Sequence, residues 1–379
     1  LLNDNSAFAT TWYQNVDKGV HDAHPVLNTA SSRVFHEGTR YSNEQIGTLS
    51  LSGKGLKDDP YLVKDKDDLE KLATFCNRGN NSAGMYFLQT ADIDLKGGGL
   101  TPIGNPGSFA GIYDGDGHTI RNGNIVVKAP SVAGVFGVVT GKVTRLCVEK
   151  MTIKGTKGDK DSDHTRTGGI AARLYGSGEI SCCFVRDCSI ICEATGVSGG
   201  VVSDMFDQSV IRNCLVIKTS LSASRTGFIS SDTKSGTQIE WCYSDGANLT
   251  SSDSYANVTN SAPGLSKANL ESGSVTYKLN GGFDNPDPAW FQNIAQGSVV
   301  DKTPVLSSDH AVVYKIDDIY TNDGEQLGKK GSGTATDPYR IETPADLKKL
   351  IISVGAMKRS NFYVRQTADI DMTDSLVVP

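Results

Sequence analysis

The sequence has few aromatic residues, no long apolar run and no excess of positive charge. Of its 379 residues only 7% are Phe, Trp or Tyr. No stretch reaches the ~18 apolar residues that a membrane-spanning helix needs. A formal net charge of −6 leaves no basic stripe to neutralise phosphates, which argues against nucleic-acid binding. No signal peptide is visible, so we expect a mature or excised segment. Glycine is plentiful, with 41 residues, and suits many short strands joined by tight turns.

The eight cysteines lack the spacing of a metal site. Cys183, Cys214 and Cys242 occupy equivalent positions of a repeat, at which Leu146 also occurs. We therefore expect them to be small buried hydrophobic residues and not a zinc or redox site. Disulfide pairing stays open as an alternative, since an extracellular location would permit it.

Four copies of a short pattern run from Val143 to Leu249. The copies begin at Val143, Ile180, Ile211 and Ile239, at spacings of 37, 31 and 28 residues. Self-similarity at a period of about 20–50 residues indicates stacked repeats, in which one coil cannot bury its apolar face alone. We predict that each six-residue copy, Ile-x-x-Cys-x-Val, is one strand of a coil followed by a four-residue bend.

A second, longer repeat relates the two ends of the chain. Residues 12–15 (WYQN) match 290–293 (WFQN) at an offset of 278, and "QTADID" occurs at both 89–94 and 366–371. "HPVL" at 24–27 likewise matches "TPVL" at 303–306. The chain is therefore predicted to hold a little more than one copy of a unit of about 280 residues.

Several short motifs together resemble one known family. They are the turn "FAGIYDGDGHTI", the small-residue strands "VAGVFG", "TGGIAA", "SGGVVS" and "TGFISS", and the Ile-x-x-Cys-x-Val pattern. This combination is similar to that of GLUG-motif proteins. The resemblance implies a right-handed parallel β-helix and a bacterial surface setting. It implies little about activity, because folds of this kind host several.

The predicted fold is thus dominated by β-structure: a right-handed parallel β-helix, or solenoid, with an N-terminal capping α-helix and small α+β closing and linker modules. Asp65 to Arg78 has apolar residues at helical spacing, with Asp65 as N-cap and Gly79 as the stop. Ser266 is expected to cap a helix that runs through residues 274–279. The predicted divisions are the tail of a preceding unit, the capped β-helix, its closing and linker module, and the head of the next unit: 1–45, 46–255, 256–327 and 328–379.

One column of the repeat departs from the apolar-inside rule. Cys147, Phe184, Leu215 and Tyr243 alternate with the inward valines and should point outward. Either another segment of the chain covers them, which we favour, or they form an exposed apolar strip that binds a partner. These four are the candidate binding residues.

A loop at residues 154–169 holds the candidate metal ligands. Asp159, Asp161 and Asp163 alternate there, as at the opening of a calcium loop, but an EF-hand would have a glycine and an acid where His164 and Ile170 stand. A solvated polar loop is the favoured interpretation and Ca²⁺ the alternative. No other cofactor is expected.

No catalytic residues are predicted. His36-Glu37 is not followed by a histidine at zinc-protease spacing, and no Gly-x-Ser-x-Gly elbow or phosphate loop occurs. Asp204 and Asp232 fall at similar points of adjacent coils, in predicted turns, where two acids could lie ~5–10 Å apart. A carbohydrate-active β-helix would use such a pair. We favour solvated turn acids.

We therefore expect a non-enzymatic, structural and adhesive segment, a stalk or fibre, of a long tandem-repeat extracellular protein on a bacterial cell surface. Its expected partners are adjacent copies of its own unit and a host surface protein or glycan. The alternative is a carbohydrate-active β-helix, a polysaccharide lyase or glycoside hydrolase that acts on an extracellular glycan.

Overall fold

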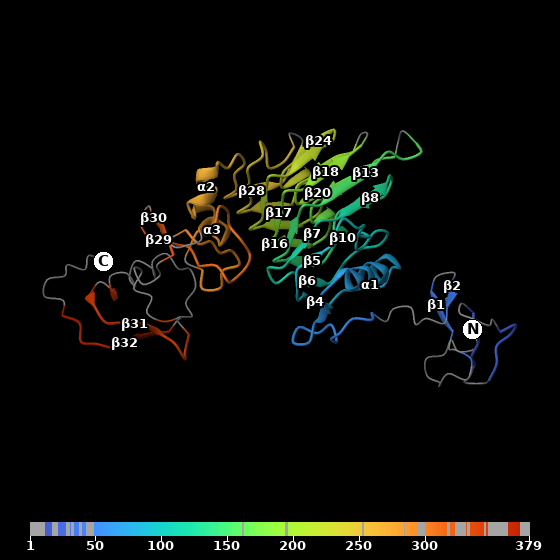
Figure 1. The fold of residues 1–379 in the computed structure, drawn as a ribbon, viewed down its shortest axis with the longest axis horizontal. Coiled ribbons are helices and arrows are strands. Elements are labelled where there is room, and N and C mark those ends of the chain that lie inside the picture. The colour runs from blue at the N-terminus through green and yellow to red at the C-terminus, as the bar shows by residue number, and fades with distance from the viewer. Residues whose placement is uncertain are drawn as a thin grey trace.

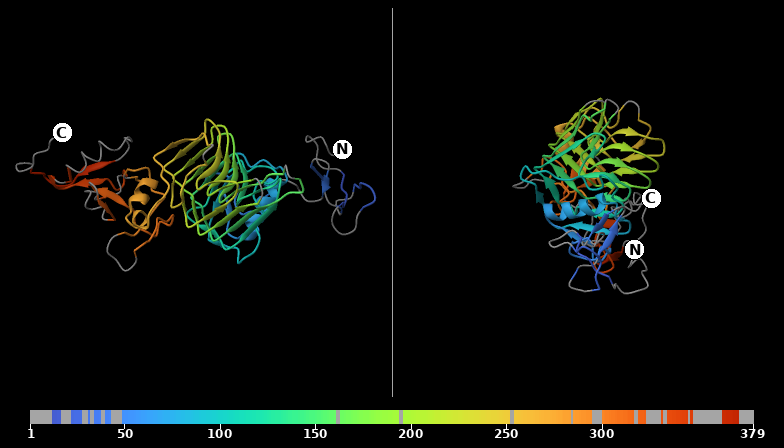
Figure 2. Two further views of the ribbon diagram at one scale, coloured as in Figure 1. Left: turned by 90° about the horizontal axis from the view of Figure 1, so that it is seen from above. Right: turned by 90° about the vertical axis from the view of Figure 1, so that its right-hand side faces the viewer.

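Short parallel strands stack side by side to form the central body of the molecule (Figures 1 and 2). The architecture is a right-handed parallel β-helix, as predicted. The computed structural model describes residues 12–16, 22–27, 31, 34–37, 40–42, 49–160, 163–193, 196–251, 254–283, 285–294, 300–316, 319–322, 331, 334–344, 346–347 and 363–371.

Five parallel sheets run along the stack within this described part. The first, in spatial order, is β28 (Asn257–Thr259), β26 (Gln238–Glu240), β21 (Val210–Arg212), β16 (Glu179–Ser181), β11 (Lys142–Thr144), β6 (Ile112–Asp114), β4 (Tyr86–Gln89) and β3 (Tyr61–Val63). The second is β27 (Tyr243–Ser244), β22 (Leu215–Ile217), β17 (Phe184–Arg186), β12 (Cys147–Glu149), β7 (Thr119–Arg121) and β5 (Ile93–Asp94).

The other three sheets of the stack have four strands each. One is β23 (Ser220–Ser222), β18 (Ser189–Cys192), β13 (Thr152–Thr156) and β8 (Asn124–Lys128). Another is β24 (Arg225–Gly227), β19 (Val197–Gly199), β14 (Arg166–Gly168) and β9 (Val132–Ala133). The last is β25 (Ser230–Thr233), β20 (Val202–Met205), β15 (Ala171–Leu174) and β10 (Phe136–Val139).

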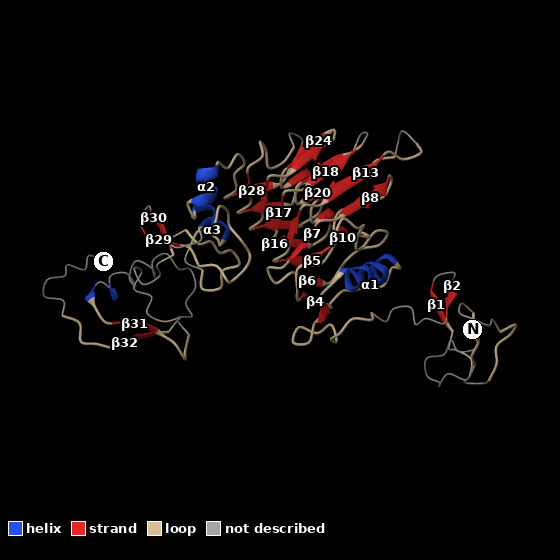
Figure 3. Cartoon of the chain, in the orientation of Figure 1, coloured by secondary structure: helices blue, strands red, loops and turns tan. Residues whose placement is uncertain are grey.

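Three small two-stranded sheets lie outside the stack. They are β1 (Phe35–Glu37) with β2 (Arg40–Ser42), β29 (Tyr314–Ile316) with β30 (Ile319–Thr321), and β31 (Tyr339–Ile341) with β32 (Val364–Gln366). Figure 3 shows how little helix accompanies the strands in the described chain.

Each repeat motif bends at a residue in the left-handed backbone conformation. The residues at this corner are Arg145, Cys182, Asn213 and Trp241, with φ between 51° and 55°. The prediction of one strand per motif was wrong, because the corner divides the motif into two strands, such as β16 and β17. The corner also explains the pattern itself. A left-handed residue ends the extended run and restarts the inward–outward alternation. Ile180 and Cys183 can therefore both face the core at an odd spacing.

A second corner follows five residues later in three of the four copies, at Lys150, Asp187 and Lys218. It consists of one left-handed residue and one inward residue, as at Asp187 (φ 53°) and Cys188, which is 3% exposed. The predicted four-residue bend is thus two residues long. The result is a coil with two sharp corners and short, nearly straight sides.

Glycine is required where coils approach one another, between β14 and β15 and between β19 and β20. A Cβ at Gly169 would lie 2.2 Å from the carbonyl oxygen of Gly200, and one at Gly200 would lie 2.0 Å from that of Phe228. No side chain fits at such distances. The close approach of successive coils therefore depends on glycine at these positions.

The helix α1 (Lys66–Asn77) packs against the first coils of the stack (Figure 1). The side chain of Asp65 accepts a hydrogen bond from the backbone N–H of Asp68 at 3.0 Å, and Gly79 has φ of 83°. Leu69 and Leu72 are 0% exposed and belong to the main hydrophobic core. The predicted cap, stop and buried face are confirmed, because the helix extends the core beyond the first strands.

Two short helices follow the last coil. They are α2 (Lys267–Glu271) and α3 (Ser274–Leu279), separated by Gly273 with φ of 82°. Ser266 is an N-cap as predicted, but of α2, since the left-handed glycine interrupts the helix. Together with residues 285–322, α2 and α3 form what we call the closing module.

Candidate functional site

The predicted outward column is buried beneath the closing module. Cys147, Phe184, Leu215 and Tyr243, which we call the strip, are register partners and only 0–4% exposed. They form a hydrophobic cluster with side chains from α2 and α3 and with two later residues of the module. Of the two alternatives, a covering segment is therefore the one observed. The strip offers no surface to an external partner here, because the protein's own chain occupies it.

Trp290 is the central contact between the closing module and the strip. Its side chain is 0% exposed, and its ring meets that of Phe184 edge-on, with ring centroids 5.5 Å apart. Its Nε1–H donates to the carbonyl oxygen of Asn213 at 3.0 Å. The side-chain amide of Asn280 holds both backbone groups of Trp290, at 2.8 and 3.0 Å. The indole N–H therefore keeps a hydrogen bond when the ring is buried. The large apolar area of Trp290 is removed from water without leaving an unsatisfied donor.

Asn213 connects the two bodies from the β-helix side. Its carbonyl oxygen accepts from Trp290, and its own Nδ2–H donates to the carbonyl oxygen of Leu279 at 2.6 Å. Asn213 also occupies the left-handed corner, with φ of 55°. Asparagine tolerates that conformation better than most residues. One residue therefore serves both the coil geometry and the attachment of the module.

The cysteine thiols are placed for packing. Cys183, Cys214 and Cys242 are 0% exposed, and all eight cysteines are free. Burial raises the pKa of Cys147 and of Cys188 to about 12. Because the thiolate is the reactive and metal-binding form, these thiols are unreactive at neutral pH. The interpretation of the cysteine column as small buried hydrophobic residues is confirmed.

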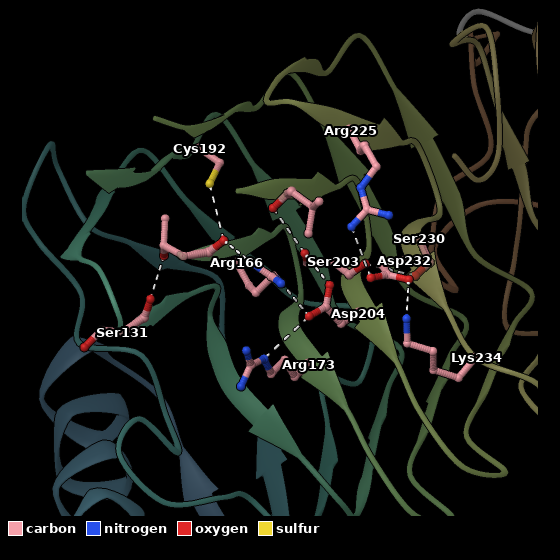
Figure 4. A network of polar contacts seen from close by, with 12 residues as sticks. Ser131, Arg166, Arg173, Cys192, Ser203, Asp204, Arg225, Ser230, Asp232 and Lys234 are labelled. Atoms are coloured by element: carbon pink, nitrogen blue, oxygen red, sulfur yellow. Dashed lines mark hydrogen bonds and ion pairs between the residues drawn. The ribbon is translucent and has the colours of Figure 1, made fainter. Parts of the chain in front are cut away.

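Two buried carboxylates lie on neighbouring coils, within the network drawn in Figure 4. Asp204 in β20 and Asp232 in β25 are register partners and are 2% and 8% exposed. The prediction of solvated turn acids was wrong, because both residues lie inside strands and beneath cationic side chains. Asp204 accepts from Arg166 Nε at 2.7 Å and lies 3.6 Å from Arg173 Nε.

The second carboxylate is paired in the same manner. Asp232 lies 2.9 Å from Lys234 Nζ and 3.3 Å from a terminal guanidinium nitrogen of Arg225. The sequence-based reasoning missed these cations. A signal was present, since Arg-Thr-Gly occurs at both 166–168 and 225–227 and places an arginine at the start of β14 and of β24.

Electrostatics and access determine what this network can do. Burial raises the pKa of Asp204, and the charges of Arg166 and Arg173 oppose that shift without cancelling it. An acid–base pair acting on a glycan must reach the glycosidic oxygen or a water molecule. Asp204 is instead buried and held by arginines. The ion pairs join neighbouring strands and coils. Removing either partner would leave an unpaired buried charge and destabilise the fold.

The structure places two of the three candidate metal ligands. Asp159 lies 2.5 Å from Lys128 Nζ, and Asp163 accepts from the backbone N–H of Lys160 at 3.0 Å. Asp161 lies outside the described residues. Within the described part of the chain, no group of three or more His, Cys, Asp or Glu side chains is arranged to hold a metal ion.

Part of the closing module occurs a second time near the start of the chain, with the same contacts. In each copy one antiparallel bridge joins two segments, and one aspartate accepts a hydrogen bond from a backbone N–H. The matched bridges are Tyr13–Val26 and Phe291–Val305. The matched hydrogen bonds are Asn15 N to Asp22 Oδ2 and Asn293 N to Asp301 Oδ2, both 2.6 Å. The antiparallel pair β1–β2 likewise matches β29–β30.

The head of the unit recurs in the same way. The parallel pair β31–β32 matches β3–β4. The glutamine that ends the second strand donates to a carbonyl two residues on in both copies: Gln89 to Ala91 at 2.8 Å, and Gln366 to Ala368 at 2.9 Å. The long repeat seen in the sequence is therefore accompanied by repeated contacts. The predicted divisions of the chain stay a prediction.

Comparison with known proteins adds two similarities. No family model matches the chain. It is 29% identical over 123 residues to Halomucin of Haloquadratum walsbyi, a match that takes in 28% of this chain and 1% of Halomucin. The crystal structure of a "putative immunoglobulin A1 protease" from Bacteroides ovatus is similar with a TM-score of 0.40 and 16% identity, over 67% of this chain and 94% of that one. Neither similarity assigns a function.

The helices of the described chain do not reach membrane-spanning dimensions. None combines the length and the apolar character that crossing a bilayer requires.

Proposed function

We propose that this chain is a segment of a long extracellular surface protein made of tandem β-helix units, with a structural and adhesive role as a stalk or fibre. One observation carries the proposal. Pieces from the tail and from the head of the unit each occur twice, with matched strand pairs and hydrogen bonds at offsets of 277 to 279 residues. A tandem array of one folded unit produces such recurrence.

The β-helix suits a mechanical role because its coils are joined by more than backbone hydrogen bonds. Glu179 lies 3.0 Å from Lys142 Nζ on the coil before it and 2.8 Å from Arg212 on the coil after it. Burial alone would raise the pKa of Glu179, but its hydrogen bond to Lys142 and the two positive charges lower it. Such ladders of alternating charge support the register of adjacent coils.

The proposed setting is the surface of a bacterial cell, and the proposed family is that of the GLUG-motif proteins. The sequence resemblance supports both. The similarity to Halomucin supports a very long parent protein, because the matched segment is 1% of that protein. The proposed partners are adjacent copies of the unit and a host surface protein or glycan.

We propose that the role is not catalytic. The pairing of Asp204 and Asp232 with arginine and lysine side chains supports this view over a carbohydrate-active β-helix. A screen for release of products from acidic and neutral polysaccharides tests the alternative. Activity that is lost in Asp204→Asn, while far-UV circular dichroism is retained, would establish the enzyme instead.

We propose no resident cofactor, with Ca²⁺ at Asp159 and Asp163 as the alternative. Thermal unfolding in excess EDTA and in millimolar Ca²⁺ separates the two. An unchanged melting temperature is expected, because Lys128 already balances one of the carboxylates. A rise of several degrees with Ca²⁺ that is lost in Asp163→Asn would show a calcium site.

Immunogold labelling of intact source cells tests the surface role. Antibodies against residues 49–322 are expected to label unpermeabilised cells along extended filaments. Label seen only after permeabilisation would contradict the proposal.

A further inference from the structure

The contact between the closing module and the strip is made by a few residues that recur elsewhere in the chain. Trp290 and Leu306 are 0% and 8% exposed because they pack in the cluster that contains the strip. The backbone of Leu306 also approaches the coil closely: a Cβ at Gly117 would lie 2.6 Å from its carbonyl oxygen. Trp12 and Leu27 stand at the matching places of the other copy.

The two copies share their internal structure and differ in burial. The matched bridge and the matched aspartate hydrogen bond show that residues 12–16 and 22–27 share these local contacts with the closing module. Leu27, however, is 62% exposed, where Leu306 is 8% exposed. Neither hydrophobic cluster contains any of the described residues 12–16 and 22–27. The apolar side chain of Leu27 thus faces solvent at the position where its counterpart, Leu306, packs in the strip cluster.

We propose that residues 12–16 and 22–27 form a docking surface for the β-helix of a second copy of this unit. Trp12 and Leu27 would take, on that copy's strip, the places of Trp290 and Leu306. The inference rests on the proposed tandem-unit function and names the partner surface for it. The contact of Trp290 and Leu306 with the strip shows which surface would receive the docked residues. The receiving surface is apolar, and Asn213 offers its carbonyl oxygen to an indole N–H.

The two modules then compete for one site. Within a chain, the module that contains Trp290 is tethered beside the strip, at an effective concentration of about millimolar. A module from another chain reaches the site only when the tethered contact is weakened. Docking between chains is therefore weak in the unaltered protein and strong in a chain whose own module binds poorly.

Sedimentation of the full 379-residue chain tests this competition. The unaltered chain and the Trp12→Ala/Leu27→Ala chain are expected to be monomers. The Trp290→Ala/Leu306→Ala chain is expected to rise in mass to dimers and longer head-to-tail oligomers as its concentration rises a hundredfold. The chain carrying all four substitutions is expected to stay a monomer. Association that persists in the fourfold variant would overturn the proposal, as would a monomeric Trp290→Ala/Leu306→Ala chain with unchanged circular dichroism.

A second measurement covers the case in which the Trp290→Ala/Leu306→Ala chain does not fold. A photoreactive residue at position 27 of the otherwise unaltered chain traps the weak docking as a covalent product. At low yield that rises with protein concentration, it is expected to crosslink to peptides from β12, β17 or β22 of a second chain. Crosslinks that map elsewhere would contradict the docking surface. Failure here leaves the surface labelling of the proposed function untouched, so the two proposals fail separately.

Discussion

The segment around Trp290 and its copy around Trp12 share an internal structure and have different surroundings. Each has the same bridge and the same 2.6 Å hydrogen bond to an aspartate. Trp290 is nevertheless fully buried, and Leu306 is 8% exposed against 62% for Leu27. The local contacts of this module therefore form without the strip, whereas the burial of Leu306 depends on it. Its stability should therefore depend on which β-helix lies beneath it.

The largest expected effect comes from removing the indole at the strip. Trp290→Ala should lower the free energy of unfolding by about 3–5 kcal/mol, because a fully buried side chain leaves a cavity against Phe184. The matched control, Trp12→Ala, should cost less than Trp290→Ala, because Trp12 is half-buried where Trp290 is fully buried. Urea denaturation followed by far-UV circular dichroism measures both. Equal losses in the two variants would break the comparison.

A smaller difference is expected at the matched leucines. Leu306→Ala should cost about 2–3 kcal/mol, since its side chain is packed in the strip cluster. Leu27→Ala should change stability by no more than about 0.5 kcal/mol, because its side chain is mostly in solvent. Thermal unfolding of the two variants, measured side by side, checks the prediction. A destabilising Leu27→Ala would show that position 27 is packed within a single chain.

The strip side of the contact can be weakened without touching either module. Asn213→Ala removes the hydrogen bond to Leu279 and leaves alanine in a left-handed conformation, for a loss of about 1–2 kcal/mol. Asn213→Gly keeps the left-handed corner and loses only the hydrogen bond, so it should lower the free energy of unfolding by less than Asn213→Ala does. Urea midpoints of both variants separate the two contributions. A glycine variant as unstable as the alanine variant would mean that the corner conformation contributes little.

The smallest expected effect is local and depends on pH. The backbone N–H of Asn15, and then the Ser31 hydroxyl, hold the pKa of Asp22 below its ordinary value of 3.8. The stabilisation is therefore present above 3.8 and is lost as pH falls through the lowered pKa. The Asn15 amide resonance should titrate with a midpoint below 3.8, and Asp22→Asn should abolish that titration. A midpoint above 3.8 would refute the hydrogen bond.

Much of the fold could be predicted because its causes are local or periodic. Asp65 and Gly79 mark the ends of α1 by capping chemistry that needs no tertiary contact. The spacing of the short repeat predicts a stacked coil, since only neighbouring copies can cover each apolar face. The division of the motif into two strands could not be predicted so easily. It depends on left-handed corners occupied by residues such as Cys182 and Trp241, which carry no strong turn signal.

The candidate sites could be predicted less well. The outward direction of Cys147 and Phe184 could be predicted from strand alternation. The segment that covers them could not be predicted in this way. The burial of Asp204 and Asp232 was missed, because their partners Arg166 and Arg173 come from strands whose positions depend on the corners.

The amino-acid sequence alone was enough to predict the repeating elements of this protein: the coil, its capping helix and the recurrence of tail and head. These follow from spacing, capping and self-similarity, which are properties of short stretches. The segment that covers the strip and the pairing of the buried charges became visible in the three-dimensional structure. The strip is covered by a tryptophan far along the chain, whose Nε1–H reaches Asn213 across 77 residues of sequence. No local pattern encodes such a contact. It forms because the apolar strip on the coil and the apolar indole of the module would each otherwise contact water. Packing them together removes both surfaces from water, which stabilises the fold.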